Sequence, residues 1–376
     1  MTDTTHREES TPATLYVALE LSTKEWWLTM SPTPRARPRR VRVPVGDRAG
    51  VAAALQTARR QFGLSDQTPV VSCYEAGRDG FWPHRLLTGL GVTNWVVDSS
   101  SIEVSRRLRQ VKTDRVDGEK LLRLLLRYGA GERGLWQVVR VPAVAIEDAR
   151  HASRARTMLQ QERTRYRNRL HGLLMLHGVR LRLDAQFPAR LAAATDWEGA
   201  PLPAGVQARL RLLWRLLHAV ERERAAARAA EAQAVRPTAP AALPTAQRLV
   251  QLRGIAARSA TVLATELWSR DIRTRRELGG LTGLVSAPHA SGHRQVDQGL
   301  IRSGLPHVRH TAIQLARVWL RHQPASALTH WFQTRFGHRG LVAYRIGIVA
   351  LARRLLIALW RYVTVGTLPQ GAWMKA

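Results

Sequence analysis

The sequence predicts an α/β domain followed by two mainly helical regions, and three observations lead to this prediction. Short apolar runs alternate with helix-like stretches from Thr14 to about Tyr128. The stretches that follow are rich in Leu and Arg and carry apolar residues at helical spacing. The 376 residues are also enough for two or three domains. We therefore expect an α/β domain at 14–130, a helical or coiled-coil region at 140–235 and a C-terminal domain at 245–365.

The predicted elements of the first domain follow one another in a simple order. They are strands at 15–21, 26–30 and 40–44, a helix at 47–62, a strand at 69–75, a helix at 82–90, a strand at 94–97 and a helix from Asp114. The strand at 40–44 alternates basic and apolar residues, which is typical of a half-exposed edge strand. A meander of three strands before alternating helices and strands is the order of a ribonuclease H-like domain. The periodicity alone predicts only an α/β fold.

The rest of the chain is predicted to be helical. The stretches 144–177 and 206–232 contain few helix-breaking residues, and they are expected either to form an antiparallel hairpin or coiled coil, or to pack separately on a domain. A segment rich in Pro and Ala at 236–244 is a plausible linker. Beyond it, residues 252–266 resemble a helix-hairpin-helix element, in which the turn at Gly254 would offer backbone N–H groups to a phosphate. Gly also ends ordinary helices, so this signal is of moderate specificity.

The charge of the chain points to a polyanionic partner. Lys and Arg number 58 against 28 Asp and Glu, which gives a formal net charge of +30. No window of 18 residues is free of charge, and the apolar stretch 346–363 is interrupted by three arginines, so it predicts an amphipathic helix and not a membrane span. The single cysteine, Cys73, excludes an internal disulfide and a cysteine-rich zinc site. The polar N-terminus has no apolar signal core, and we expect a cytoplasmic, nucleoid-associated protein.

Four acidic residues are predicted to meet at one edge of the first domain. Glu20 and Glu75 stand at the ends of predicted strands, and Asp114 and Asp117 lie three residues apart at the start of a helix, on one face. The ends of parallel strands and the starts of the helices that follow them lie at the same end of an α/β sheet. Carboxylates that converge there can hold the divalent metal ions that assist phosphodiester cleavage. Any one of these acids taken alone would be interpreted as a surface group or a helix cap.

Two motifs in this order resemble a known family. The sequence Tyr-Glu-Ala-Gly at 74–77, followed by Lys-Thr-Asp-Arg-Val-Asp at 112–117, is similar to the signature of the Asp-Glu-Asp-Asp transposases of the insertion sequence 110 family. The C-terminal segment also matches, with Gly254, then residues 276–284, then Ala-Ser-Gly-His-Arg at 290–294. The similarity covers most of the chain and is weakest in the helical middle.

The resemblance implies a RuvC-like, ribonuclease H-like domain and a recombinase that excises and inserts its own mobile element. Its partners would be the DNA of the element ends and target, a structured noncoding bridge RNA that pairs with both, and further copies in a dimer or tetramer. Glu75, Asp114 and Asp117 match the second, third and fourth acids that bind Mg²⁺, and Glu20 stands where the family usually has Asp. Ser291 stands where the nucleophilic serine is expected.

Several residues around these positions are candidate nucleic-acid contacts. Arginine binds phosphate through a bidentate fork, and glycine lets a DNA backbone approach closely. The candidates are Arg106, Arg107, Arg109, Lys112, Arg115, Gly254, Gly292, Arg294 and Arg302. The chain departs from the family pattern at Glu20, at Gly118 in place of alanine, at His293 in place of a second glycine, and at Leu305-Pro306 in place of Gly-Asn.

Two other functions remain open from the sequence. The first is a metal-dependent, structure-specific nuclease in which the acids activate water and Ser291 is merely structural. The second is a degenerate copy that binds nucleic acid without cutting it. A covalent protein–DNA adduct distinguishes the transposase from both.

Overall fold

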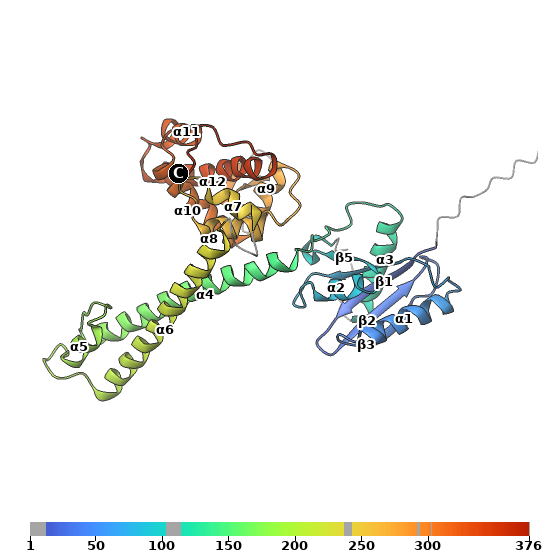
Figure 1. The fold of residues 1–376 in the computed structure, drawn as a ribbon, viewed down its shortest axis with the longest axis horizontal. Coiled ribbons are helices and arrows are strands. Elements are labelled where there is room, and N and C mark those ends of the chain that lie inside the picture. The colour runs from blue at the N-terminus through green and yellow to red at the C-terminus, as the bar shows by residue number, and fades with distance from the viewer. Residues whose placement is uncertain (1–12, 103–113, 237–242, 292–293, 302, 376) are drawn as a thin grey trace, which may run out of the picture. The chain divides into compact units, whose positions relative to one another are not determined.

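The computed structural model describes residues 13–102, 114–236, 243–291, 294–301 and 303–375 (Figure 1). The chain divides into two compact units, Met1–Val141 and Pro142–Ala376. The second unit contains both the predicted helical region and the predicted C-terminal domain.

A five-stranded mixed sheet forms the centre of the first unit. Its strands are β1 (Leu15–Leu21), β2 (Glu25–Ser31), β3 (Arg39–Pro44), β4 (Val70–Glu75) and β5 (Thr93–Val97). Their order is β3-β2-β1-β4-β5, in which β1, β2 and β3 pair antiparallel and β1, β4 and β5 pair parallel. The α/β fold predicted from the alternating pattern is therefore confirmed for this unit.

Helices cover both faces of this sheet. They are α1 (Arg48–Gln61), α2 (Trp82–Thr88) and α3 (Asp114–Gly129), and a short 3-10 turn, η1 (Ser99–Ser101), follows β5. Helices α1 and α2 share one apolar cluster with one face of the sheet, and α3 shares a second cluster with the other face. The carboxylate of Asp47 caps α1 by accepting a hydrogen bond from the N–H of Gly50 at 2.8 Å, as the sequence predicts.

Two long helices begin the second unit and lie side by side (Figure 1). They are α4 (Val144–Met175) and α6 (Ala204–Ala234), and the short helix α5 (Phe187–Ala192) lies in the connection between them. Leu174 of α4, Phe187 of α5 and Trp214 of α6 belong to one buried cluster. Ion pairs between Arg163 and Glu221 at 3.1 Å and between Arg156 and Glu231 join the long helices elsewhere. Of the two predicted arrangements, the structure shows the antiparallel hairpin.

The remaining helices surround a second apolar core. They are α7 (Pro244–Val250), α8 (Ala257–Val262), α9 (Arg275–Thr282), α10 (Pro306–His322), α11 (Ala327–Phe336) and α12 (Gly340–Val365), and a π-helical turn, η3 (Leu263–Leu267), continues α8. Trp319 of α10 is fully buried at the centre of this core. Pro306 begins α10, where its fixed φ suits the first helical turn. None of the helices in the described ranges is both long enough and apolar enough to cross a membrane.

A β-hairpin interrupts these helices. Strands β6 (Ser286–Ser291) and β7 (Arg294–Leu300) pair antiparallel, with an irregularity between Ser286 and Pro288. The sequence predicts a predominantly helical segment here. Pro288, His289 and the polar residues of β7 break the alternation of apolar and polar residues that marks a strand. The hairpin carries Ser291, the predicted nucleophile.

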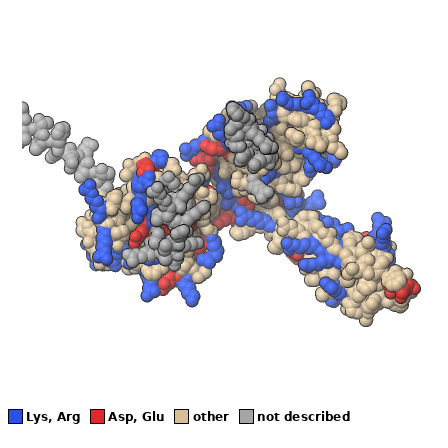
Figure 2. Space-filling model, turned by 180° about the vertical axis from the view of Figure 1, so that it is seen from behind, with Lys and Arg blue, Asp and Glu red and all other residues tan. Residues whose placement is uncertain are grey.

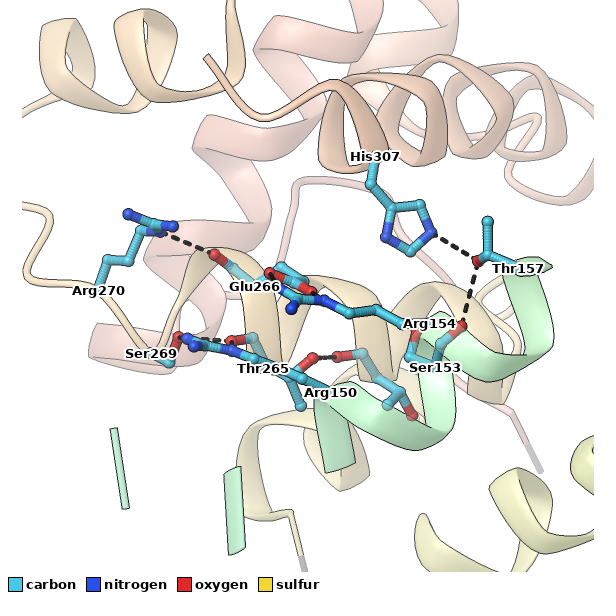
Figure 3. Close-up of polar contacts among 10 residues, drawn as sticks. Arg150, Ser153, Arg154, Thr157, Thr265, Glu266, Ser269, Arg270 and His307 are labelled. Carbon is cyan, nitrogen blue, oxygen red and sulfur yellow. Dashed lines mark hydrogen bonds and ion pairs between the residues drawn. The ribbon is translucent and has the colours of Figure 1, made fainter. Parts of the chain in front are cut away.

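A buried polar cluster attaches α4 to the C-terminal core (Figure 3). The guanidinium of Arg154 donates to both carboxylate oxygens of Glu266, at 2.9 and 3.2 Å. Arg150 donates to the carbonyl of Thr265 and to the hydroxyl of Ser269, each at 2.7 Å. Glu266 is 6% exposed, so loss of Arg154 would leave its carboxylate buried without this partner. The cluster therefore fixes the long helices to the core.

Candidate catalytic site and membership of a transposase family

Two predicted catalytic acids stand side by side on the sheet of the first unit. Strands β1 and β4 pair in parallel, and Leu19 is aligned with Tyr74, so the next residues, Glu20 and Glu75, are also neighbours. Neighbouring strands lie about 4.8 Å apart. Two residues earlier, the aligned pair Ala18 and Cys73 faces α3. Since side chains alternate between the faces of a strand, Glu20 and Glu75 belong to the face that α3 covers.

Helix α3 brings the other two acids to the same end of the sheet. A Cβ built on Gly118 would lie 2.9 Å from Oγ1 of Thr29 and 3.9 Å from Oε2 of Glu20. At the other end of α3, a Cβ on Gly129 would lie 2.5 Å from the ring of Tyr16. The helix therefore runs antiparallel to β1, and its first turns lie over the end of β1 that carries Glu20.

Asp114 and Asp117 both belong to these first turns. Asp117 directly precedes Gly118 and its side chain is exposed, as is that of Glu75. The backbone of Asp114 begins α3, while its side chain lies outside the part of the chain that the structure describes. The structure thus brings Glu20, Glu75 and the start of α3 together.

An arginine that the sequence analysis did not connect with the acids lies beside them. Arg40 of β3 places its Nη2 atom 3.8 Å from Oε2 of Glu20, and both side chains are about one quarter exposed, at 23% and 26%. The guanidinium of Arg40 also stacks on Trp27, 4.0 Å from the ring centre. The alternation of basic and apolar residues along β3 is visible in the sequence, but the register that aligns Arg40 with Thr29 is not. Arg40 is therefore a positive charge beside the first candidate ligand.

Cys73 takes no part in this chemistry. Burial raises the pKa of its thiol, and the nearby charge of Glu75 raises it further. A thiol in this environment stays protonated, whereas a metal ligand or nucleophile has to be a thiolate. Cys73 is a small residue of the buried core.

The acids suit a divalent metal in the type of their side chains. Carboxylate oxygens are the ligands that Mg²⁺ prefers, and Glu20 and Glu75 are aligned neighbours at an accessible edge. Among the side chains that the structure describes, no three His, Cys, Asp or Glu residues stand close enough together to hold a metal ion. That set includes Glu20, Glu75 and Asp117, so these three do not form a metal-holding group by themselves, whereas the side chain of Asp114 lies outside it.

Ser291 lies at the end of a β-hairpin in the second unit. It is the last residue of β6 and is aligned with Arg294, the first residue of β7. Gly292 lies between them, outside the described residues, and so does Arg302 beyond the hairpin. The backbone therefore places Ser291 and Arg294 opposite each other at the tip of the hairpin.

The turn at Gly254 joins α7 to α8, as the predicted helix-hairpin-helix element requires. Gly254 has a φ of 87°, which only glycine adopts readily, and a Cβ there would lie 3.0 Å from Cβ of His322. The C-terminal segment covers this turn. The N–H of Arg253 donates to the carbonyl of Trp373 at 2.9 Å, and Nζ of Lys375 donates to the carbonyl of Ile255 at 2.8 Å. The N–H of Arg253 and the carbonyl of Ile255, which flank Gly254, are thus already hydrogen-bonded within the protein.

Most of the predicted phosphate contacts cannot be placed. Arg106, Arg107, Arg109 and Lys112 lie outside the described residues, as does the side chain of Arg115. On the face shown in Figure 2, Lys and Arg side chains are spread over both units and outnumber Asp and Glu. The distribution agrees with the charge of +30 and marks no single described patch as the nucleic-acid surface.

Comparisons with known proteins identify the family of the chain. Residues 246–330 match the model of the transposase IS116/IS110/IS902 family. The chain is 40% identical to the protein named "Putative transposase y4rJ" from Sinorhizobium fredii, in a match that covers 96% of this chain and 94% of that protein. It is also 28% identical to the transposase for insertion sequence element IS1328 from Yersinia enterocolitica, over 57% of this chain and 62% of that protein. The chain therefore belongs to the IS116/IS110/IS902 family of transposases.

Proposed function

We propose that this chain is a DNA transposase in which carboxylates of a ribonuclease H-like, RuvC-like domain bind Mg²⁺ and Ser291 attacks the DNA. The observation that carries the proposal is the alignment of Glu20 with Glu75, under the helix that begins with Asp114 and contains Asp117. The sheet order β3-β2-β1-β4-β5 supports the assignment of the domain, because it combines the antiparallel meander and the parallel pair that this fold requires.

The chemistry assigned to Ser291 is a phosphodiester exchange. Its Oγ forms a bond to phosphorus while the bond from phosphorus to one deoxyribose oxygen breaks, and the leaving oxygen takes up a proton. The new phosphoester stores the energy of the old one, so strands can be rejoined without an external energy source. Mg²⁺ held by Glu20, Glu75, Asp114 and Asp117 would neutralise the negative charge that develops on phosphorus.

The contribution of the chain's own residues is binding and orientation. Arg40 offsets part of the charge of Glu20 and stands beside the position where a phosphate would approach. Arg294 lies opposite Ser291 in the hairpin, where a guanidinium can hold a phosphate through two hydrogen bonds. Arg106, Arg107, Arg109, Lys112, Arg115 and Arg302, together with Gly254 and Gly292, are proposed as further contacts to nucleic acid.

The proposed partners are DNA, a structured noncoding guide RNA and further copies of the chain in a dimer or tetramer. Basic side chains that bind phosphate carry no sequence information, so a guide RNA that pairs with the element and the target would supply it. Action on chromosomal DNA implies that the protein works at the nucleoid.

The test is capture of a covalent intermediate. The purified protein is incubated with Mg²⁺, with RNA transcribed from the flanking sequence of the element and with DNA that carries the element junction. We expect a slow-migrating protein–DNA adduct that is lost in Ser291→Ala and in Asp117→Asn, while both variants still bind the DNA. Ser303→Ala, at an exposed serine of the second unit outside the hairpin, is the matched control and should form the adduct normally.

A metal-dependent nuclease is the second candidate, because the acids all lie in the first unit and Ser291 lies in the second. In a nuclease the acids would activate water, and the DNA would be cut without an adduct. Cleavage that persists in Ser291→Ala but is abolished by Asp117→Asn would establish this alternative and contradict the serine mechanism.

A further inference from the structure

The end of the chain has an unusual charge composition. Residues 298–376 contain no Asp and no Glu, although they contain ten arginines and one lysine. Helices α10, α11 and α12 all lie in this stretch. A solvated protein surface normally mixes both signs of charge. A surface built from these helices can therefore be neutralised only by other parts of the molecule or by an anionic partner.

A large groove opens on this surface. It has a volume of about 1090 Å³ and lies between α9, the β6–β7 hairpin, α11 and α12. One face of α12 lines it, with Ile346, Val349, Arg353, Ile357 and Arg361 at intervals of three and four residues. The groove thus has both apolar and cationic walls.

Four arginines line the groove: Arg275, Arg353, Arg354 and Arg361. All four are exposed, and none has a carboxylate within ion-pair distance among the residues that the structure describes. The guanidinium of Arg354 stacks on Trp331, 4.1 Å from the ring centre. Like charges gathered in this way repel one another, so an anion that binds between them is favoured.

The walls of the groove select the kind of anion. Arg353 and Arg361 are eight residues apart, which is about 12 Å along the helix axis, so they would contact different phosphates of one strand. Ile346, which is 60% exposed, Val349 and Ile357 offer apolar contacts that suit the flat faces of unpaired bases. Grooves that bind single-stranded nucleic acid combine cations along the backbone with apolar surfaces for the exposed bases, and here aliphatic side chains stand in the place of the aromatic ones. A second copy of a chain with a charge of +30 would instead add to the repulsion.

The hairpin that carries the candidate nucleophile forms part of the groove wall. Ser286, Gly299 and Leu300 belong to its lining, and Ser291 lies five residues beyond Ser286 on β6, which corresponds to about 17 Å of extended strand. We infer that this groove binds a single DNA strand, with its phosphates on Arg275, Arg353 and Arg361, and leads that strand toward Ser291. The choice of DNA over RNA rests on the proposed function of Ser291.

The experiment compares two double variants that remove the same charge. Arg353→Gln with Arg361→Gln changes the groove, whereas Arg321→Gln with Arg335→Gln changes two exposed arginines of α10 and α11 outside it. Both are made in the full chain in the Ser291→Ala background, and thermal unfolding confirms that they fold. Binding of labelled single-stranded DNA, single-stranded RNA of the same sequence and duplex DNA is measured by fluorescence anisotropy over a range of KCl concentrations without Mg²⁺.

We expect the groove variant to bind single-stranded DNA about tenfold more weakly. The slope of the logarithm of the binding constant against the logarithm of the KCl concentration should be smaller in magnitude by about 1.4, as for two lost phosphate contacts. The control variant should change the affinity by less than about threefold and leave the slope nearly unchanged. Equal losses in the two variants, a loss confined to RNA or to duplex DNA, or a change in oligomeric state with unchanged DNA binding would each overturn the inference.

This experiment separates the groove from the proposed chemistry. Because it uses Ser291→Ala and no Mg²⁺, its result does not depend on formation of an adduct. Normal DNA binding by the groove variant, in a protein whose wild-type form makes the Ser291 adduct, would refute the groove and leave the proposed function intact. A selective loss of DNA binding in a protein that makes no adduct would support the groove and refute the role of Ser291.

Discussion

Gly118 should be required for the correct placement of α3 over the acids. An alanine at this position would bring its Cβ to 2.9 Å from Oγ1 of Thr29, which is too short for a contact between these atoms. Thr29 is 1% exposed and has little room to move, so α3 has to shift away from β2. Since Asp117 is the preceding residue, its carboxylate would shift relative to Glu20.

The magnitude follows from two opposing terms. Alanine in a helix interior is more favourable than glycine by about 1 kcal/mol. Forcing an extra methyl group into a well-packed contact costs roughly 1–3 kcal/mol. We therefore expect Gly118→Ala to lower the free energy of unfolding by about 1 kcal/mol. A displacement of about 1 Å at a catalytic group costs on the order of 100-fold in rate, so formation of the Ser291 adduct should slow by about 10- to 100-fold.

The assay pairs thermal unfolding with the rate of adduct formation and uses a matched control. Gly172 lies in α4 with no atom within 4 Å of a Cβ built there, so Gly172→Ala should raise stability and leave the rate unchanged. Combining Gly118→Ala with Thr29→Ala removes the contact and should restore much of the rate. If Gly118→Ala proves as stabilising as Gly172→Ala and keeps the full rate, the close approach between α3 and β2 is refuted.

Three further predictions concern the ion pair between Arg154 and Glu266, a histidine and the metal. Arg154→Met leaves the buried carboxylate of Glu266 without its bidentate partner and should lower the free energy of unfolding by about 2 kcal/mol. This loss is smaller than for a fully buried pair because Arg154 is 59% exposed. Adding Glu266→Gln should recover part of the loss, as measured by chemical denaturation. Burial lowers the pKa of His307, so the unfolded chain takes up a proton near pH 6.5 that the folded chain resists, and stability should fall as the pH drops below about 6.5. His307→Gln should flatten the dependence of Tm on pH between 7 and 5, and an unchanged profile would exclude His307 as its cause. Mg²⁺ at ten times its Kd should stabilise the wild type by about 1.4 kcal/mol, measured as a rise in Tm, and should have no such effect on Glu75→Gln.

Much of the first unit could be predicted from sequence because its signals are local. The apolar runs of β1, β2 and β4 mark buried strands, and Asp47 and Asp98 occupy N-capping positions, where Asp is a preferred residue. Asp98 accepts a hydrogen bond from the N–H of Ser100 at 2.9 Å. These features depend on residues within a few positions of one another, so a single sequence contains the information.

The remaining features depend on long-range register and packing. Arg40 reaches Glu20 because β3, β2 and β1 pair in a particular alignment, which no local pattern encodes. The hairpin that carries Ser291 has polar strands, and its pairing becomes visible only in the structure. The C-terminal segment that covers the turn at Gly254 comes from a site more than one hundred residues away. The functional arrangement therefore needs tertiary structure even where the individual residues are already suspected.

The charge distribution of the acids supports a cation at the edge of the sheet. Like charges on aligned positions of neighbouring strands destabilise a sheet, and Glu20 and Glu75 occupy such positions. Arg40 lies 3.8 Å from Glu20, so a positive charge stands beside one of the two carboxylates. A phosphate that approached these carboxylates would meet further repulsion, whereas the rest of the chain, with its charge of +30, would attract it. In the proposed mechanism a divalent cation would be attracted to the two carboxylates and would present a positive charge to the phosphate. Under the proposed function, the aligned acids would therefore serve cleavage of nucleic acid and not binding alone.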